Sequence, residues 1–160
     1  MHRVPTYFLR LVILALSLGV LALCIFGLPS ILHGASAEFP YASRAVFLIV
    51  MGIYMTTIPF YIALWQMMRL LSNIDSNNAF SESSVQALRV IKYCAAAIAG
   101  FYMAFVPLLF PIADADDAPG LILIGFGIAC APVATAIFAA ILQKLMQTGM
   151  ELRSEVELTV

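Results

Sequence analysis

The sequence predicts an all-α integral membrane protein, a single membrane domain over 1–160 that forms a bundle of four transmembrane helices. Of the 160 residues, 63% are hydrophobic and 11% are charged, and the mean hydropathy is +1.01. A soluble domain has about 45–50% apolar residues, so the lipid bilayer is the expected solvent. Four segments contain no charged residue: 11–32, 45–68, 93–113 and 118–143. Each exceeds the length of about 18 residues that marks a membrane-spanning helix.

These segments must be helical, because the membrane interior offers no water to backbone N–H and C=O groups. A closed β-barrel would need alternating strands, which the sequence does not contain. The predicted helices cover about 7–32, 45–71, 82–113 and 118–148, with a polar connection at 72–92 and a tail at 149–160.

The first apolar segment also has features of a cleavable signal peptide. Arg3 and Arg10 precede it, and Ala35 and Ala37 have the spacing of a cleavage site. The apolar core of a signal peptide has about 7–15 residues, and this segment is longer. We therefore expect a retained helix.

The positions of Lys and Arg predict that both termini are cytoplasmic. With the N-terminus inside, every Lys and Arg except Arg44 would lie on the cytoplasmic side. Basic residues flanking membrane helices are concentrated on that side. The connection 72–92 and the tail 149–160 would then be cytoplasmic.

The connection 72–92 contains signals for a turn followed by a helix start. Its first part is rich in Asn and Ser, which favour turns. Ser81 is a plausible N-cap, Glu82 suits the positive end of the helix dipole, and Phe80 could pack against Val85. We expect an ordered cytoplasmic element that leads into the third membrane helix.

The four apolar segments contain no Asp, Glu, Lys, Arg or His. Such residues ordinarily mark proton relays and ion pathways in membranes, and catalysis would need an acid/base pair or an activated nucleophile. The three cysteines have no metal or redox spacing, and the basic residues form no run that suggests direct nucleic-acid binding. We expect no enzymatic activity, no cofactor and no metal.

An acidic turn lies between the last two predicted helices and contains Asp114, Asp116 and Asp117. Its carboxylates could hold a cation on the external side, but Ca²⁺ takes about six to eight oxygen ligands. The simpler interpretation is capping, with Asp117 at the start of the fourth helix and Pro119 in its first turn.

Prolines interrupt the apolar segments, and threonines lie near two of them. Thr56 and Thr57 precede Pro59, and Thr135 follows Pro132. The simplest interpretation is kinks tolerated by packing, since Thr hydroxyls can satisfy the freed carbonyls. Broken helices also build solute sites, so the alternative function is a small oligomeric permease or export component for a neutral or lipophilic solute.

Small residues also recur at helical spacing in the last two segments. Ala96 with Gly100, and Gly125 with Ala129, would let helix backbones approach closely. This pattern serves packing within one chain or the formation of a homo-oligomer, and packing within the chain is the simpler use.

Three blocks together resemble the bacterial membrane protein family catalogued as domain of unknown function 2975. They are 78–85 with 91–94, 113–120, and the tail 155–160. The resemblance implies a four-helix membrane protein of no established activity, in a family often encoded beside a small helix-turn-helix regulator. The tail departs from the family pattern, because Val156 stands where an Asn is common.

The resemblance gives the leading functional hypothesis, a non-enzymatic membrane partner or sensor for a small cytoplasmic helix-turn-helix regulator. It would lie as a multi-pass protein in the bacterial inner membrane. The expected partner-binding residues lie in the connection and the tail: Asn78, Phe80, Ser81, Glu82, Ser84, Leu158 and Val160.

Overall fold

The computed structural model describes residues 4–38, 40–41 and 43–159, and in this part of the chain every regular element is a helix. Four helical segments are long and apolar enough to cross a membrane. The elements in order are α1 (Val4–Ala22), η1 (Leu23–Gly27), α2 (Leu28–Glu38), α3 (Ser43–Asp75), α4 (Glu82–Phe105), η2 (Val106–Leu109), α5 (Phe110–Ala115) and α6 (Gly120–Thr159).

Two of the four membrane-length segments contain a change of helix type. The π-helix η1 joins α1 to α2 in the first segment, and the 3₁₀-helix η2 joins α4 to α5 in the third. Pro107 lies within η2. Pro59 and Pro132 lie inside α3 and α6, which continue past them as α-helix.

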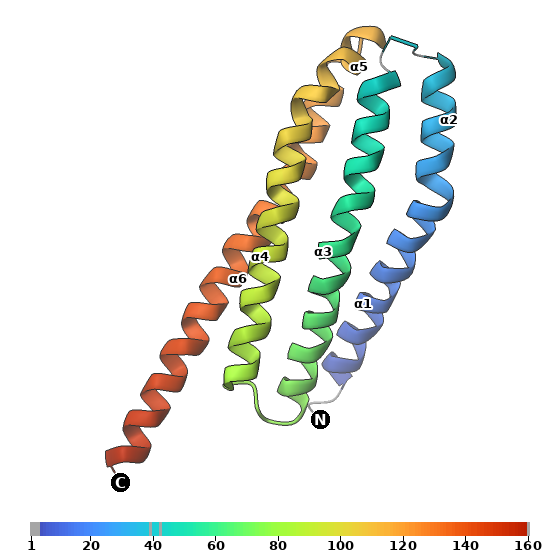
Figure 1. Ribbon diagram of the computed structural model, residues 1–160. Coiled ribbons are helices and arrows are strands. Elements are labelled where there is room, and N and C mark those ends of the chain that lie inside the picture. The colour runs from blue at the N-terminus through green and yellow to red at the C-terminus, as the bar shows by residue number, and fades with distance from the viewer. Residues whose placement is uncertain (1–3, 39, 42, 160) are drawn as a thin grey trace.

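The helices form an up-and-down arrangement in which α4 lies between α3 and α6 (Figure 1). The segment α1–η1–α2 packs along α3 on the other side. The start of α1, the α3–α4 connection and the end of α6 all lie at one end of the bundle, which we call the terminal end (Figure 1). At this end α6 diverges from α4 and projects beyond the other helices.

The buried core is small, as expected for a protein whose outer surface faces lipid. One cluster joins Ile13 of α1 to Leu64 and Leu71 of α3. Another joins Leu28 to Val46 and Val50 near the opposite end. Of the four membrane-length helices, α6 is the least buried.

The two small-residue pairs differ in their surroundings. Ala129 is fully buried, and a Cβ on Gly125 would lie 2.2 Å from Cδ1 of Leu109 in η2, so this pair packs within the chain. Ala96 and Gly100 are exposed, and a Cβ on Gly100 would meet no atom within 4 Å. The chain's own packing therefore accounts for one pair only.

Two helix ends are closed by residues in the left-handed conformation. After α3, Asn77 has a φ of 58°, and the Asn78 N–H donates to the Asn73 carbonyl oxygen at 2.9 Å. After α5, Asp117 has a φ of 49°, and the Ala118 N–H donates to the Ala113 carbonyl oxygen at 3.0 Å. Both are Schellman-type ends, for which Asn and Asp are tolerated in place of Gly.

The conformation of Asp117 corrects one expectation. The sequence predicts Asp117 as the N-cap of the fourth helix, whereas Asp117 follows α5 and α6 begins at Gly120. An N-cap residue has an extended backbone, and Asp117 does not. The residue therefore ends one helix rather than starting the next.

The helices extend further than hydropathy alone predicts. The expected end of the fourth helix is near 148, but α6 continues to Thr159, so the predicted tail is helical over 149–159. The expected connection 72–92 shortens to 76–81, since α3 ends at Asp75 and α4 starts at Glu82.

Candidate interaction site at the terminal end

The turn between α3 and α4 is organised by the cap of α4. The Ser81 backbone is extended, and its hydroxyl accepts a hydrogen bond from the Ser84 N–H at 3.3 Å. Glu82 occupies the first turn, where its charge favours the helix dipole. The predicted N-cap at Ser81 is confirmed.

Ser84 is the centre of a hydrogen-bond network inside this turn. The Asn73 amide nitrogen donates to the hydroxyls of Ser83 and Ser84, at 3.2 Å each. The Ser84 hydroxyl lies 3.2 Å from that of Ser81 and donates to the Asn78 carbonyl oxygen at 3.4 Å. Its side chain is fully buried. Ser84 was expected at a partner-binding surface, but in this structure it holds the turn together from within.

Phe80 connects the turn to α6. A Cβ on Gly149 would lie 2.9 Å from Cε1 of the Phe80 ring, so the ring lies directly against this glycine. The sequence predicts packing of Phe80 against Val85 in the first turns of α4, and the structure shows a contact of Phe80 with α6. Phe80 is still 55% exposed, which leaves part of its ring available to a partner.

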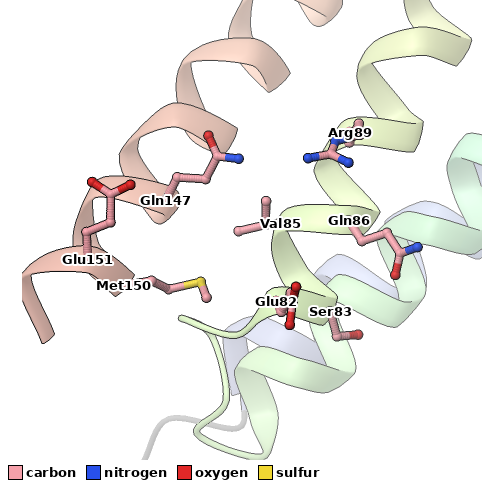
Figure 2. A pocket seen from close by; sticks show the side chains of 8 residues that line it. All are labelled: Glu82, Ser83, Val85, Gln86, Arg89, Gln147, Met150 and Glu151. Carbon is pink, nitrogen blue, oxygen red and sulfur yellow. The ribbon is translucent and has the colours of Figure 1, made fainter. Parts of the chain in front are cut away.

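A cleft of about 650 Å³ lies beside this contact, between α4 and α6. Figure 2 shows its walls, formed by Glu82, Ser83, Val85, Gln86 and Arg89 of α4 and by Gln147, Met150 and Glu151 of α6. The cleft exists because α6 diverges from α4 at the terminal end (Figure 1).

The charged groups of the cleft are unpaired within the described part of the chain. The two ion pairs among the described residues lie outside the cleft and join Arg10 to Asp75 and Arg153 to Glu157. The Arg89 side chain points toward α6 (Figure 2) and has Glu82 and Glu151 in the same cleft. The cleft thus offers both signs of charge around the apolar side chains of Val85 and Met150.

The face of α6 that lines the cleft continues beyond the bundle. Gln147 and Glu151 are followed on the same helix face by Ser154 and Leu158, at steps of three and four residues. Leu158 is 85% exposed. Of the other predicted partner-binding residues, Asn78 and Glu82 are exposed, and Val160 lies outside the described residues.

The sequence matches one family over almost its whole length. The family model described as "Protein of unknown function (DUF2975)" matches residues 4–160. The chain belongs to this family. An uncharacterized membrane protein, YoaS of Bacillus subtilis (strain 168), is 44% identical over 160 residues, which is the full length of both chains. No solved structure matches the chain.

For this DUF2975 protein, sequence reasoning missed the α6 wall of the cleft. Gln147 lies in the last turn of the helix expected to end near 148, and Glu151 lies in the expected tail, although both belong to α6. Their spacing of four residues was the available signal, since it is typical of one helix face. Arg89 was also missed, because its position relative to α6 depends on how the helices pack.

The acidic turn does not form a compact site. Asp114, Asp116 and Asp117 are all exposed. No group of three or more His, Cys, Asp or Glu side chains among the described residues is arranged to hold a metal ion. The turn serves at least one structural role, the closure of α5 at Asp117.

The three threonines named for a solute path do not come together. Thr56 and Thr57 line a small cavity inside the bundle. Thr135 is exposed on α6, and its hydroxyl donates to the Ala131 carbonyl oxygen of the same helix at 3.0 Å. Thr135 therefore belongs to a different surface.

Proposed function

We propose that this chain is a non-enzymatic protein of the bacterial cell membrane whose terminal end faces the cytoplasm and binds a small helix-turn-helix regulator. The proposed orientation places every Lys and Arg except Arg44 on the cytoplasmic side, as the positive-inside rule requires. The binding surface would be the cleft between α4 and α6 together with the projecting part of α6.

The observation that carries this proposal is the cleft. It is open, it contains unpaired charges beside apolar groups, and its α6 face extends to Leu158. A binding site for a protein commonly combines an apolar centre with a polar rim. Phe80, which contacts Gly149 next to the cleft residue Met150, is itself 55% exposed.

The negative charge of the projecting part of α6 supports a partner with a basic surface. The part of α6 beyond Gly149 carries three glutamates and one arginine: Glu151, Arg153, Glu155 and Glu157. A helix-turn-helix protein binds DNA through a basic surface that neutralises phosphates. An acidic helix would attract that surface, so binding at the membrane would compete with binding to DNA.

The test is in-cell crosslinking from a photoreactive amino acid at Gln147, with mass spectrometry of the captured proteins. The matched control is the same group at Leu123, which is 77% exposed on the same helix near the opposite end of the bundle. We expect a helix-turn-helix protein from Gln147 and not from Leu123. Capture of lipid and of the chain itself alone, at both positions, would contradict the proposal.

A charge-reversal pair tests the electrostatic argument. Glu151→Lys with Glu155→Lys should reduce capture of the regulator about tenfold or more, because it replaces attraction with repulsion. Asp116→Lys, at the other end of the bundle, should leave capture unchanged.

A further inference from the structure

A second hollow, open at its surface, lies between the helices away from the terminal end, in two parts that share lining residues. One part, of about 130 Å³, is lined by α1, η1, α3 and α4 and includes Thr56 and Thr57. The other, of about 340 Å³, extends toward η2 and α6 and includes Leu109 and Ile128. Leu23, Ile53 and Tyr102 line both parts. The larger part has the size of a small-molecule site.

Both irregular helices contribute walls to this cavity. Leu23 comes from the π-helix η1, and Val106 and Leu109 come from the 3₁₀-helix η2. In membrane segments, irregular backbone is found where it is buried in protein or lines a cavity, and π-bulges are frequent at functional sites. The Tyr54 hydroxyl donates to the Cys24 carbonyl oxygen at 2.7 Å and so satisfies a backbone group of η1.

The hydroxyl groups in the cavity are unequally satisfied. Thr56 and Thr57 each donate their single proton to the Ile53 carbonyl oxygen at 2.9 Å. The Tyr102 hydroxyl has one contact among the described residues, at 3.5 Å from the Thr56 hydroxyl. That distance is at the outer limit of a hydrogen bond. Among these three hydroxyl groups, the Tyr102 O–H is therefore the donor without a close acceptor.

These features select the chemistry of an occupant. The Tyr102 side chain is partly buried, and a phenol removed from water ordinarily has a hydrogen-bond partner. No charged side chain lines either part of the cavity, so an ionic occupant would lose its hydration without compensation. Water needs two to four polar partners, which the mainly aliphatic and aromatic lining of the larger part does not supply.

We infer that this cavity binds a neutral lipophilic molecule that presents one carbonyl or similar acceptor to the Tyr102 hydroxyl. The molecule would enter from the lipid phase, and its apolar body would lie against Ile53, Leu109 and Ile128. This site is separate from the cleft at the terminal end, and the inference does not depend on the proposed regulator.

The test uses two ligands that differ by one acceptor. The protein is placed in nanodiscs of phosphatidylcholine and phosphatidylglycerol and labelled with benzophenone under light. Fluorenone or fluorene, which differ chiefly in the carbonyl oxygen, is present as a competitor during the illumination, at equal mole fraction in the lipid. We expect saturable labelling of peptides that line the cavity, with fluorenone about two- to tenfold more effective than fluorene, as one hydrogen bond allows.

Two pairs of variants separate the hydrogen bond from the shape. Tyr102→Phe should abolish the advantage of fluorenone, whereas Tyr93→Phe, on the exposed side of α4, should keep it. Gly125→Ala should weaken labelling, because its Cβ would displace the Leu109 side chain into the cavity. Gly127→Ala should not, since its Cβ meets no atom within 4 Å.

Two results would overturn the inference. Labelling that does not saturate and spreads over lipid-facing residues would show simple partitioning into the bilayer. Saturable labelling with equal competition by fluorenone and fluorene would show an acyl-chain groove without an acceptor site.

Discussion

At the scale of single residues, burial separates the side chains that build the turn from those that can meet a partner. Ser84 is fully buried, whereas Asn78 and Glu82 in the same turn are exposed. The sequence could identify Ser81 as a cap, because a cap depends on local backbone geometry. It could not show that Ser84 is covered, because that depends on contacts with Asn73 across the turn.

Ser84→Ala should destabilise the protein by about 1–3 kcal/mol, because it leaves groups of the buried network without a partner. Ser154→Ala, at an exposed position on α6, should change stability by less than about 0.5 kcal/mol. Thermal unfolding of the two variants in detergent, measured side by side, checks this. Equal stabilities would show that the turn does not depend on the Ser84 hydroxyl.

At the scale of helices, hydropathy located the four apolar segments and placed their ends less well. Hydropathy reports which part of a chain can lie in lipid. It does not mark the end of a helix, because a helix can continue from the membrane into water. The polar part of α6 is helical up to Thr159, although an isolated helix of this length is marginal in water. Contact of Gly149 with Phe80 and the exposed Arg153–Glu157 pair, at 3.6 Å, support it locally.

Helix type was also beyond the sequence. No residue type among 23–27 distinguishes a π-helix from an α-helix, and the Tyr54 hydroxyl that donates to the Cys24 carbonyl oxygen of this segment comes from α3, 30 residues further along the chain. Asp117 illustrates a related ambiguity. Where two helices are separated by a few residues, an Asp suits the end of the first or the start of the second, and the backbone conformation decides between them.

Spin labels on α6 test its helical continuation. With the native cysteines replaced by alanine, labels at Lys144 and Leu158 should have backbone positions about 21 Å apart, the rise of fourteen helical residues. A disordered tail would give a broad distribution reaching toward about 46 Å. A narrow distribution that broadens in Phe80→Ala would also show that the contact at Gly149 supports this part of α6.

At the scale of the whole molecule, the bundle presents two different environments. The apolar parts of its helices face lipid. The helix α6 has 40 residues and is therefore about 60 Å long, which exceeds the thickness of the membrane core, about 30 Å. The sequence predicted the all-helical membrane architecture because the apolar segments are long and free of charge. The cleft and the inner cavity required the relative positions of helices, which a single sequence does not give.

The orientation of the bundle can be tested with a thiol reagent that does not cross membranes. In a variant without native cysteines, Asp116→Cys should react in intact cells, because its turn is expected outside. Glu151→Cys should react only after the cells are permeabilised. The reverse pattern would place the cleft on the outer side, out of reach of a cytoplasmic regulator.

The continuity of α6 has a mechanical consequence. Buried side chains hold this helix against the bundle as far as Gln143, and the cavity wall at Gly125 and Ile128 belongs to the same held part. Thr159 lies 16 residues beyond Gln143, about 24 Å for a straight helix. A tilt of the projecting part by about 5° at Gln143 would move that end by about 2 Å. The projecting helix thus enlarges, at its far end, a small change of angle where it leaves the bundle.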